Sequence, residues 1–169
     1  MYSEDQIADR VRELAEQINK DYEGKSIHLI CVLKGSVFFF CELAKHLTMP
    51  VTIDFIAVSS YGNETSSSGK LRITKELDEE IDGLDCLIVE DIIDSGNTIK
   101  MMHDLIAARN PADVRICALL DKPSRRETEV NIDYTGFVIP DHFVVGYGLD
   151  YAQKYRNLPY IGNVEFVED

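Results

Sequence analysis

The sequence has few basic residues and no long apolar stretch. Of its 169 residues, 17 are Lys or Arg and 30 are Asp or Glu, which gives a formal net charge of −13. Nucleic-acid binding depends on a basic surface, so this charge argues against a nucleic-acid partner. No apolar run approaches the roughly 18 residues that a membrane span needs, so we expect no membrane partner either.

Signals for secretion and for disulfide or metal cross-links are also missing. The first five residues are acidic and lack the basic start and apolar core of a signal peptide. The four cysteines form no C-x-x-C pair, and each lies in or beside an apolar run. We therefore expect a cytoplasmic protein of one domain with reduced, buried thiols at Cys31, Cys41, Cys86 and Cys117.

Three common phosphate-site motifs are absent. The chain has no G-x-x-x-x-G-K-[ST], which excludes a P-loop NTPase, and no G-x-G-x-x-G after a strand, which disfavours a dinucleotide fold. Asp91 and Asp94 are three residues apart, which argues against the D-x-D nucleophile motif of haloacid-dehalogenase-type phosphatases. A phosphate site in this chain must be built differently.

The most informative segment runs from Leu87 to Thr98. A short apolar run turns acidic at Glu90 and Asp91, and a turn of Asp, Ser, Gly, Asn and Thr then leads into an amphipathic helical pattern. A tight loop before a helix directs backbone N–H groups at one point, where phosphate binds well. Carboxylates suit Mg²⁺ or sugar hydroxyls. The two parts together predict a site for a phosphorylated sugar.

The hydrophobic periodicity predicts alternating helices and strands. Such alternation implies right-handed crossovers and a twisted, mainly parallel sheet flanked by helices, which is an α/β fold. A Ser- and Gly-rich loop at about residues 59–70 has the composition of a mobile lid. The expected helices are residues 3–21, 37–47 and 98–109, and the expected strands are residues 27–33, 51–58, 71–77, 86–89, 114–120 and 137–139, with residues 143–145 as a short strand or extended turn.

Polar residues directly follow three of these strands. They are Lys34 with Gly35, Glu90 with Asp91, and Lys122. Because ligands of open parallel sheets bind beyond the carboxyl ends of the strands, we expect these residues to converge on one site.

The segment from Leu87 to Thr98 resembles the phosphoribosyl-pyrophosphate (PRPP) signature of type I phosphoribosyltransferases. Residues 120–123 (Leu-Asp-Lys-Pro) and 139–151 narrow the resemblance to the hypoxanthine-guanine enzymes. It implies a single domain over residues 1–169, with a small hood subdomain formed by the terminal segments and a flexible active-site loop. The family's first loop, here Leu33-Lys34-Gly35, often contains a cis peptide. Relatives often carry Thr and Lys where this chain has Ser95 and Asn97.

The resemblance also implies a role for each site residue. Asp94 matches the general base, and His142 is given no role. The remaining roles form four groups: PRPP and pyrophosphate binding by Lys34, Gly35, Ser60, Tyr61 and Arg156; 5′-phosphate and ribose binding by Glu90, Asp91, Asp94, Ser95, Gly96, Asn97 and Thr98; purine binding by Lys122, Phe143, Val144 and Asp150; and Mg²⁺ binding by Glu90, Asp91 and Asp150.

The implied activity is purine salvage. The enzyme would transfer 5-phosphoribosyl from PRPP to hypoxanthine or guanine, with Mg²⁺ as cofactor, and would act as a homodimer or homotetramer. Two alternatives remain open: an enzyme that prefers xanthine or guanine, and a nucleotide-responsive RNA-binding regulator on the same fold. The charge of −13 disfavours the regulator.

Overall fold

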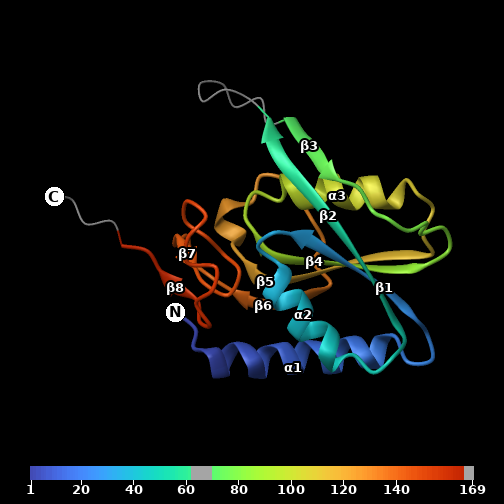
Figure 1. Cartoon of the computed structure of the whole chain (residues 1–169), viewed down its shortest axis with the longest axis horizontal. Coiled ribbons are helices and arrows are strands. Elements are labelled where there is room, and N and C mark those ends of the chain that lie inside the picture. The colour runs from blue at the N-terminus through green and yellow to red at the C-terminus, as the bar shows by residue number, and fades with distance from the viewer. Residues whose placement is uncertain (62–69, 166–169) are drawn as a thin grey trace.

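The computed structural model describes residues 1–61 and 70–165 and forms an α/β fold around a six-stranded sheet (Figure 1). The strand order is β3-β2-β1-β4-β5-β6, and a separate two-stranded sheet pairs β7 with β8. The elements are α1 (Glu4–Asp21), β1 (Ile27–Leu33), α2 (Val37–His46), β2 (Val51–Tyr61), β3 (Lys70–Lys75), β4 (Asp85–Ile93), α3 (Asn97–Ala107), β5 (Asp113–Asp121), the 3-10 turn η1 (Pro123–Arg125), β6 (Tyr134–Val138), β7 (Val144–Val145) and β8 (Gly162–Asn163).

The sheet is parallel except at one edge. Strands β2, β1, β4, β5 and β6 pair in parallel, and β3 returns antiparallel to β2. Helices α1 and α2 cover one face of the sheet and α3 covers the other (Figure 1). The predicted mainly parallel sheet flanked by helices is therefore confirmed, and the carboxyl ends of β1, β4 and β5 meet at one edge.

The central strands are buried on both faces. In β1, Leu29 and Cys31 join the hydrophobic cluster under α1 and α2, whereas Ile30 and Val32 join the cluster under α3. Alternate side chains of a strand point to opposite faces, so one continuous apolar run fills both clusters. This explains why the strand at residues 27–33 was predictable to the residue.

Helix α1 follows from its apolar spacing and its first residues. Ile7, Val11 and Ile18 are among the buried residues of its inner face. Ser3 caps the helix, because its hydroxyl accepts from the Gln6 backbone N–H and the Gln6 side chain accepts from the Ser3 backbone N–H. This reciprocal capping box satisfies two N–H groups that the helix leaves unpaired.

Several predicted boundaries were wrong. Strand β4 continues to Ile93, so Glu90 and Asp91 lie within the strand and do not follow it. Strand β2 runs to Tyr61 and β3 starts at Lys70, which shortens the predicted loop at residues 59–70. Pairing with neighbouring strands extends both strands past their apolar cores. The rest of that loop, residues 62–69, lies outside the described residues.

The thiol prediction was partly wrong as well. Cys31, Cys86 and Cys117 are buried, but Cys41 is exposed because it lies on the outer side of α2. Burial raises the pKa of the Cys31 thiol to about 12 and that of Cys86 to about 11. The four cysteines are unpaired. Buried thiols with raised pKa values are poor nucleophiles and metal ligands, so they serve as core side chains.

The N-terminal segment lies beside the last strand (Figure 1). Tyr2 pairs with Ile161 through two backbone hydrogen bonds of 3.0 Å, and its ring stacks on Phe137 with centroids 3.9 Å apart. These contacts bring together the two segments that would form the hood, which stays a prediction.

None of the helices within the described residues has the length and hydrophobicity of a membrane span.

Candidate active site

Two adjacent carboxylates, one buried and one half-buried, mark the centre of the site. Glu90 is only 7% exposed and lies in β4 next to the half-buried Asp91. The hydroxyl of Ser36, at the start of α2, donates to Glu90 Oε1 at 3.0 Å and accepts from the Asp91 backbone N–H at 2.9 Å. The position of this pair is therefore fixed by a serine of the neighbouring α2 segment.

The two carboxylates favour a cation. Burial and the nearby charge of Asp91 raise the pKa of Glu90 well above its usual range. Burial also raises the pKa of Asp91, although hydrogen bonds from Glu90 and the Ile92 N–H and the positive charge of Arg156 oppose that shift. Two closely spaced oxygen-ligand side chains with this repulsion fit a hard divalent cation such as Mg²⁺.

The first loop lies directly against this pair. The Leu33–Lys34 peptide is cis, in agreement with the resemblance, and Lys34 is exposed. A Cβ at Gly35 would lie 1.7 Å from Asp91 Oδ2, and a Cβ at Gly148 would lie 2.0 Å from the Gly35 carbonyl oxygen. The backbone at Gly35 therefore fits between the acidic strand and the C-terminal segment.

The turn after β4 forms a small cavity at the start of α3. Gly96 has φ +85°, a backbone conformation that other residues rarely adopt, and Ser95 Oγ accepts from the Asn97 N–H at 3.3 Å. The side chain of Asn97 is bonded to Glu127 and Thr128. The cavity measures about 90 Å³ and is lined by Glu90, Ile92, Ile93, Asp94, Ser95, Gly96, Thr98 and Ile99.

The shape and position of this cavity suit a small anion. It is formed by the backbone that begins α3, whose first N–H groups have no partner within the helix. The positive end of the helix dipole also favours negative charge there. Of the residues predicted to bind the 5′-phosphate and ribose, Asp91 and Asn97 do not line this cavity, whereas the others do: Glu90, Asp94, Ser95, Gly96 and Thr98.

A buried lysine lies beside the predicted general base. Lys122 is 6% exposed, and its Nζ is 3.7 Å from Oδ1 of the half-exposed Asp94. The Lys122 backbone N–H donates to the Ile93 carbonyl at 3.0 Å, which joins the ends of β4 and β5. Asp94 and Lys122 thus directly follow two adjacent strands, β4 and β5, at the same edge of the sheet.

The C-terminal segment supplies an ion pair and aromatic rings. Arg156 Nη2 lies 2.9 Å from Asp150 Oδ1, and Arg156 Nη1 donates to the Gly148 carbonyl at 2.7 Å. Phe143 is 46% exposed and meets the Tyr151 ring edge to face at 5.6 Å. Val144 is buried in β7. An exposed ring beside a buried strand is suited to stack on a flat ligand.

The structure brings most of the predicted site residues together in two groups. One joins the Gly35 loop, Asp91 and the Gly148–Arg156 segment, and the other joins Asp94 and Lys122. Glu90 belongs to both, since it neighbours Asp91 and lines the small cavity. The side chains of Ser60 and Tyr61 lie outside the described part of the chain.

Sequence reasoning missed two side chains at this site. Ser36 was given no role, and nothing in a single serine signals that its hydroxyl joins the Glu90 carboxylate to the Asp91 backbone N–H. Asp141 lies 3.9 Å from Lys122 Nζ, but its motif was assigned to base recognition without a role for this carboxylate. Among the described residues no cluster of three or more His, Cys, Asp or Glu is arranged to hold a metal.

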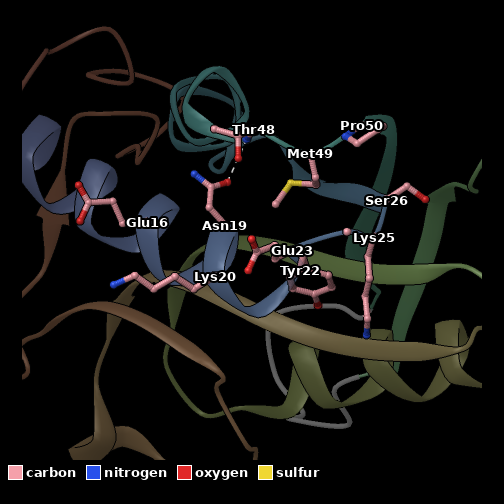
Figure 2. A pocket seen from close by; sticks show the side chains of 11 residues that line it. Glu16, Asn19, Lys20, Tyr22, Glu23, Lys25, Ser26, Thr48, Met49 and Pro50 are labelled. Carbon is pink, nitrogen blue, oxygen red and sulfur yellow. Dashed lines mark hydrogen bonds between the residues drawn. The ribbon is translucent and has the colours of Figure 1, made fainter.

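A larger cavity lies away from this edge. It measures about 910 Å³ and lies where α1 ends and where β1 and β2 begin, at the amino ends of the strands. Figure 2 shows Asn19, Lys20 and Glu23 of the α1 end around it, with Asn19 Oδ1 accepting from the Thr48 N–H at 3.0 Å. None of the predicted site residues lines it.

A family model and the similar known proteins all point to the same family, the phosphoribosyltransferases. A family model described as the phosphoribosyl transferase domain matches residues 2–152. The chain is 47% identical to the hypoxanthine phosphoribosyltransferase of Salmonella typhimurium, covering 100% of this chain and 96% of that protein. It is 48% identical to the bifunctional protein TilS/HprT of Listeria monocytogenes, covering 96% of this chain but only 25% of that longer protein.

A solved structure agrees over the whole fold. The crystal structure of a hypoxanthine-guanine phosphoribosyltransferase from Bacillus anthracis superposes with a TM-score of 0.93 at 48% identity. The match covers 98% of this chain and 97% of that chain.

Proposed function

Because the chain belongs to the phosphoribosyl transferase family and, within it, to the hypoxanthine phosphoribosyltransferases, we propose that it transfers 5-phosphoribosyl from PRPP to hypoxanthine and guanine. The products would be IMP or GMP and pyrophosphate. One observation supports the proposal: the buried Glu90 with its neighbour Asp91, a small cavity at a helix N-terminus and a buried lysine beside Asp94 share one sheet edge.

PRPP would lie across the two residue groups. The turn from Asp94 to Thr98 would hold its 5′-phosphate with backbone N–H groups and the hydroxyls of Ser95 and Thr98. Lys34 and the Gly35 backbone would hold the pyrophosphate, and Arg156 would add paired donors to it. Both ends of PRPP would then be fixed, with C1′ between them.

The lid would act on the same substrate. Strand β2 ends at Tyr61, and Ser60 and Tyr61 would close over the bound PRPP. Closure would exclude water, which otherwise competes with the purine for an activated ribosyl group.

The residues present fit a Mg²⁺ cofactor. Glu90 and Asp91 would hold the cation near the ribose, and Asp150 would hold a second near the pyrophosphate. Such a small carboxylate set is ordinary for Mg²⁺, which takes much of its coordination from water and substrate oxygens. When bound, the metal supplies positive charge that stabilises the departing pyrophosphate.

The purine would bind between strand β7 and the end of β5. Phe143 would stack on the ring, and the Val144 backbone would hydrogen-bond its edge. Lys122 would donate to the 6-oxo group, which selects against adenine because an amino group cannot accept that bond. Asp94 would take the proton from N7 as the new bond to the ribose forms.

Three narrower properties belong to the same proposal. The protein would act in the cytoplasm, as a homodimer or homotetramer, on small molecules. Base preference among hypoxanthine, guanine and xanthine depends on backbone carbonyls near Val144 and Asp150, and a xanthine- or guanine-preferring enzyme is the closest alternative.

A spectrophotometric assay with PRPP and Mg²⁺ tests this function. Hypoxanthine, guanine, xanthine and adenine are offered in parallel, and each reaction is repeated with EDTA. Turnover of hypoxanthine and guanine that EDTA abolishes is expected. Turnover of xanthine or of guanine alone would favour the alternative enzyme, and turnover of no base would contradict the proposed function.

A further inference from the structure

Four side chains of alternating charge form a row at the purine end of the site. Asp94 Oδ1 is 3.7 Å from Lys122 Nζ, Lys122 Nζ is 3.9 Å from Asp141 Oδ1, and Asp141 Oδ2 is 3.6 Å from Arg125 Nη1. Asp94 and Lys122 already have roles in the proposed reaction. Asp141 and Arg125 have none, so the purpose of a second carboxylate beside Lys122 needs an explanation.

The exposure of these side chains shows which of them depends on the others. The Lys122 side chain is 7% exposed, whereas those of Asp94 and Asp141 are 50% and 53% exposed. A buried ammonium is costly unless it is paired with opposite charge. Both carboxylates lie farther from Nζ than hydrogen-bond length, so they balance its charge while its N–H donors stay available for a ligand.

The reaction would remove one of these two counter-charges. When Asp94 takes the purine proton, its carboxylate becomes neutral. At that moment Lys122 must still donate to the 6-oxo group, although the negative charge of Asp94 no longer balances its ammonium. Asp141 takes no proton from the purine in this step, so it keeps its negative charge beside the ammonium throughout.

The backbone holds Asp141 in this position. The Ile139 N–H donates to the Asp121 carbonyl at 2.9 Å, and Asp121 directly precedes Lys122 in the chain. The His142 N–H donates to the Pro140 carbonyl at 2.8 Å, which closes a tight turn around Asp141. Asp141 is therefore tied to the same strand end as the lysine that it faces.

We propose that Asp141 is a positioning residue for base recognition: it holds the Lys122 ammonium toward the purine 6-oxo group while Asp94 is neutralised. This inference rests on the proposed function. Arg125 pairs with Asp141 from the solvent side and so limits its movement away from Lys122.

The test compares Asp141→Asn with the parent enzyme by steady-state kinetics. Because Asp141 is half exposed and water screens part of its charge, KM for hypoxanthine should rise about three- to tenfold, while KM for PRPP should change less than about twofold. Asp141→Glu should recover part of the loss. Glu129→Gln removes an exposed carboxylate from the β5–β6 connection, which also carries Lys122, and should leave both KM values unchanged.

A double-mutant cycle separates positioning from a general structural role. In a Lys122→Met background, Asp141→Asn should cause no further rise in KM for hypoxanthine, since its target is gone. An unchanged KM in Asp141→Asn, or an equal rise in both backgrounds, overturns the inference while the parent remains active. A parent without turnover of any base overturns the proposed function and this inference with it.

Discussion

The backbone at Gly35 lies against the carboxylate of Asp91 so closely that a Cβ there would be 1.7 Å from Oδ2. The same peptide meets Gly148, whose added Cβ would be 2.0 Å from the Gly35 carbonyl oxygen. Neither approach leaves room for a side chain. Glycine at position 35 thus lets the first loop, β4 and the C-terminal segment meet at one point.

Gly35→Ala should therefore disturb the site more than the fold. The added methyl group must displace Asp91 or the loop, and a shift of about 1 Å at a reacting centre can cost about 10²-fold in rate. We expect kcat/KM for PRPP to fall by about that factor. Gly162→Ala, whose Cβ would meet only ordinary contacts, is the control. Parent-like kinetics in Gly35→Ala would contradict the close approach.

Ser36→Ala should weaken both stability and substrate binding. The substitution removes a hydroxyl that partners Glu90 Oε1 and the Asp91 N–H, and both groups lie in a buried setting. Glu90 Oε1 and the Asp91 N–H still bond each other at 3.1 Å, so the cost is that of the lost hydrogen bonds, about 0.5–1.5 kcal/mol each. Urea denaturation should show a loss of that size, and KM for PRPP should rise. Ser26→Ala, at an exposed position, should change neither; equal behaviour of the two variants would refute the role of Ser36.

Asp94→Asn tests the general base. Loss of general-base assistance typically lowers turnover by about 10²–10⁴-fold. Asparagine keeps the shape of the side chain, so PRPP affinity should change little. Steady-state kinetics and equilibrium binding of PRPP separate the two effects. A near-normal kcat in this variant would remove Asp94 from the proposed role.

Much of this site was predictable because its parts are consecutive in the sequence. The segment from Leu87 to Thr98 encodes a strand, a turn and a helix start in that order, with the two acids inside the end of the strand. The position of Lys122 at a strand end followed from the parallel sheet. The predicted end of β4 was wrong because Glu90 is polar yet buried, and apolar periodicity marks such a residue as loop.

Contacts between distant segments were not predictable. Ser36 bonds Glu90 and Asp91, which follow it in the chain by 54 and 55 positions. Asp141 meets Lys122 only because the end of β5 and the segment after β6 lie together. A single serine or aspartate in a turn carries no information about its partner in space. The exposure of Cys41 was not predictable either, because α2 carries apolar residues outside its buried face as well as on it.

A second buried carboxylate, Asp54, fixes the connection between β3 and β4. It is 1% exposed and accepts backbone hydrogen bonds from Phe55, Asp78 and Glu79 at 2.7–3.1 Å, and His28 Nε2 lies 3.7 Å from it. Burial alone would raise the pKa of Asp54, but the backbone N–H groups outweigh it, with His28 contributing last, and the pKa is lowered.

Asp54→Asn should therefore lower stability in a pH-dependent way. Because the pKa of Asp54 is lower in the folded state, its contribution is fully present above the ordinary value of 3.8 and is lost as the pH falls below it. Urea denaturation should give a deficit of about 1.5–3 kcal/mol at neutral pH, which narrows in acid. Asp9→Asn, which removes an exposed pair with Arg12, should cost less than about 1 kcal/mol. A deficit that is the same at every pH would contradict the charged role.

Transfer of phosphoribosyl to a purine can be followed directly by ³¹P NMR of the protein mixed with PRPP, Mg²⁺ and hypoxanthine. The PRPP signals should be replaced by those of IMP and pyrophosphate in equal amounts, and omission of hypoxanthine should leave PRPP intact. Unchanged PRPP, or its conversion to ribose 5-phosphate and pyrophosphate without IMP, would contradict transfer to a purine at this site.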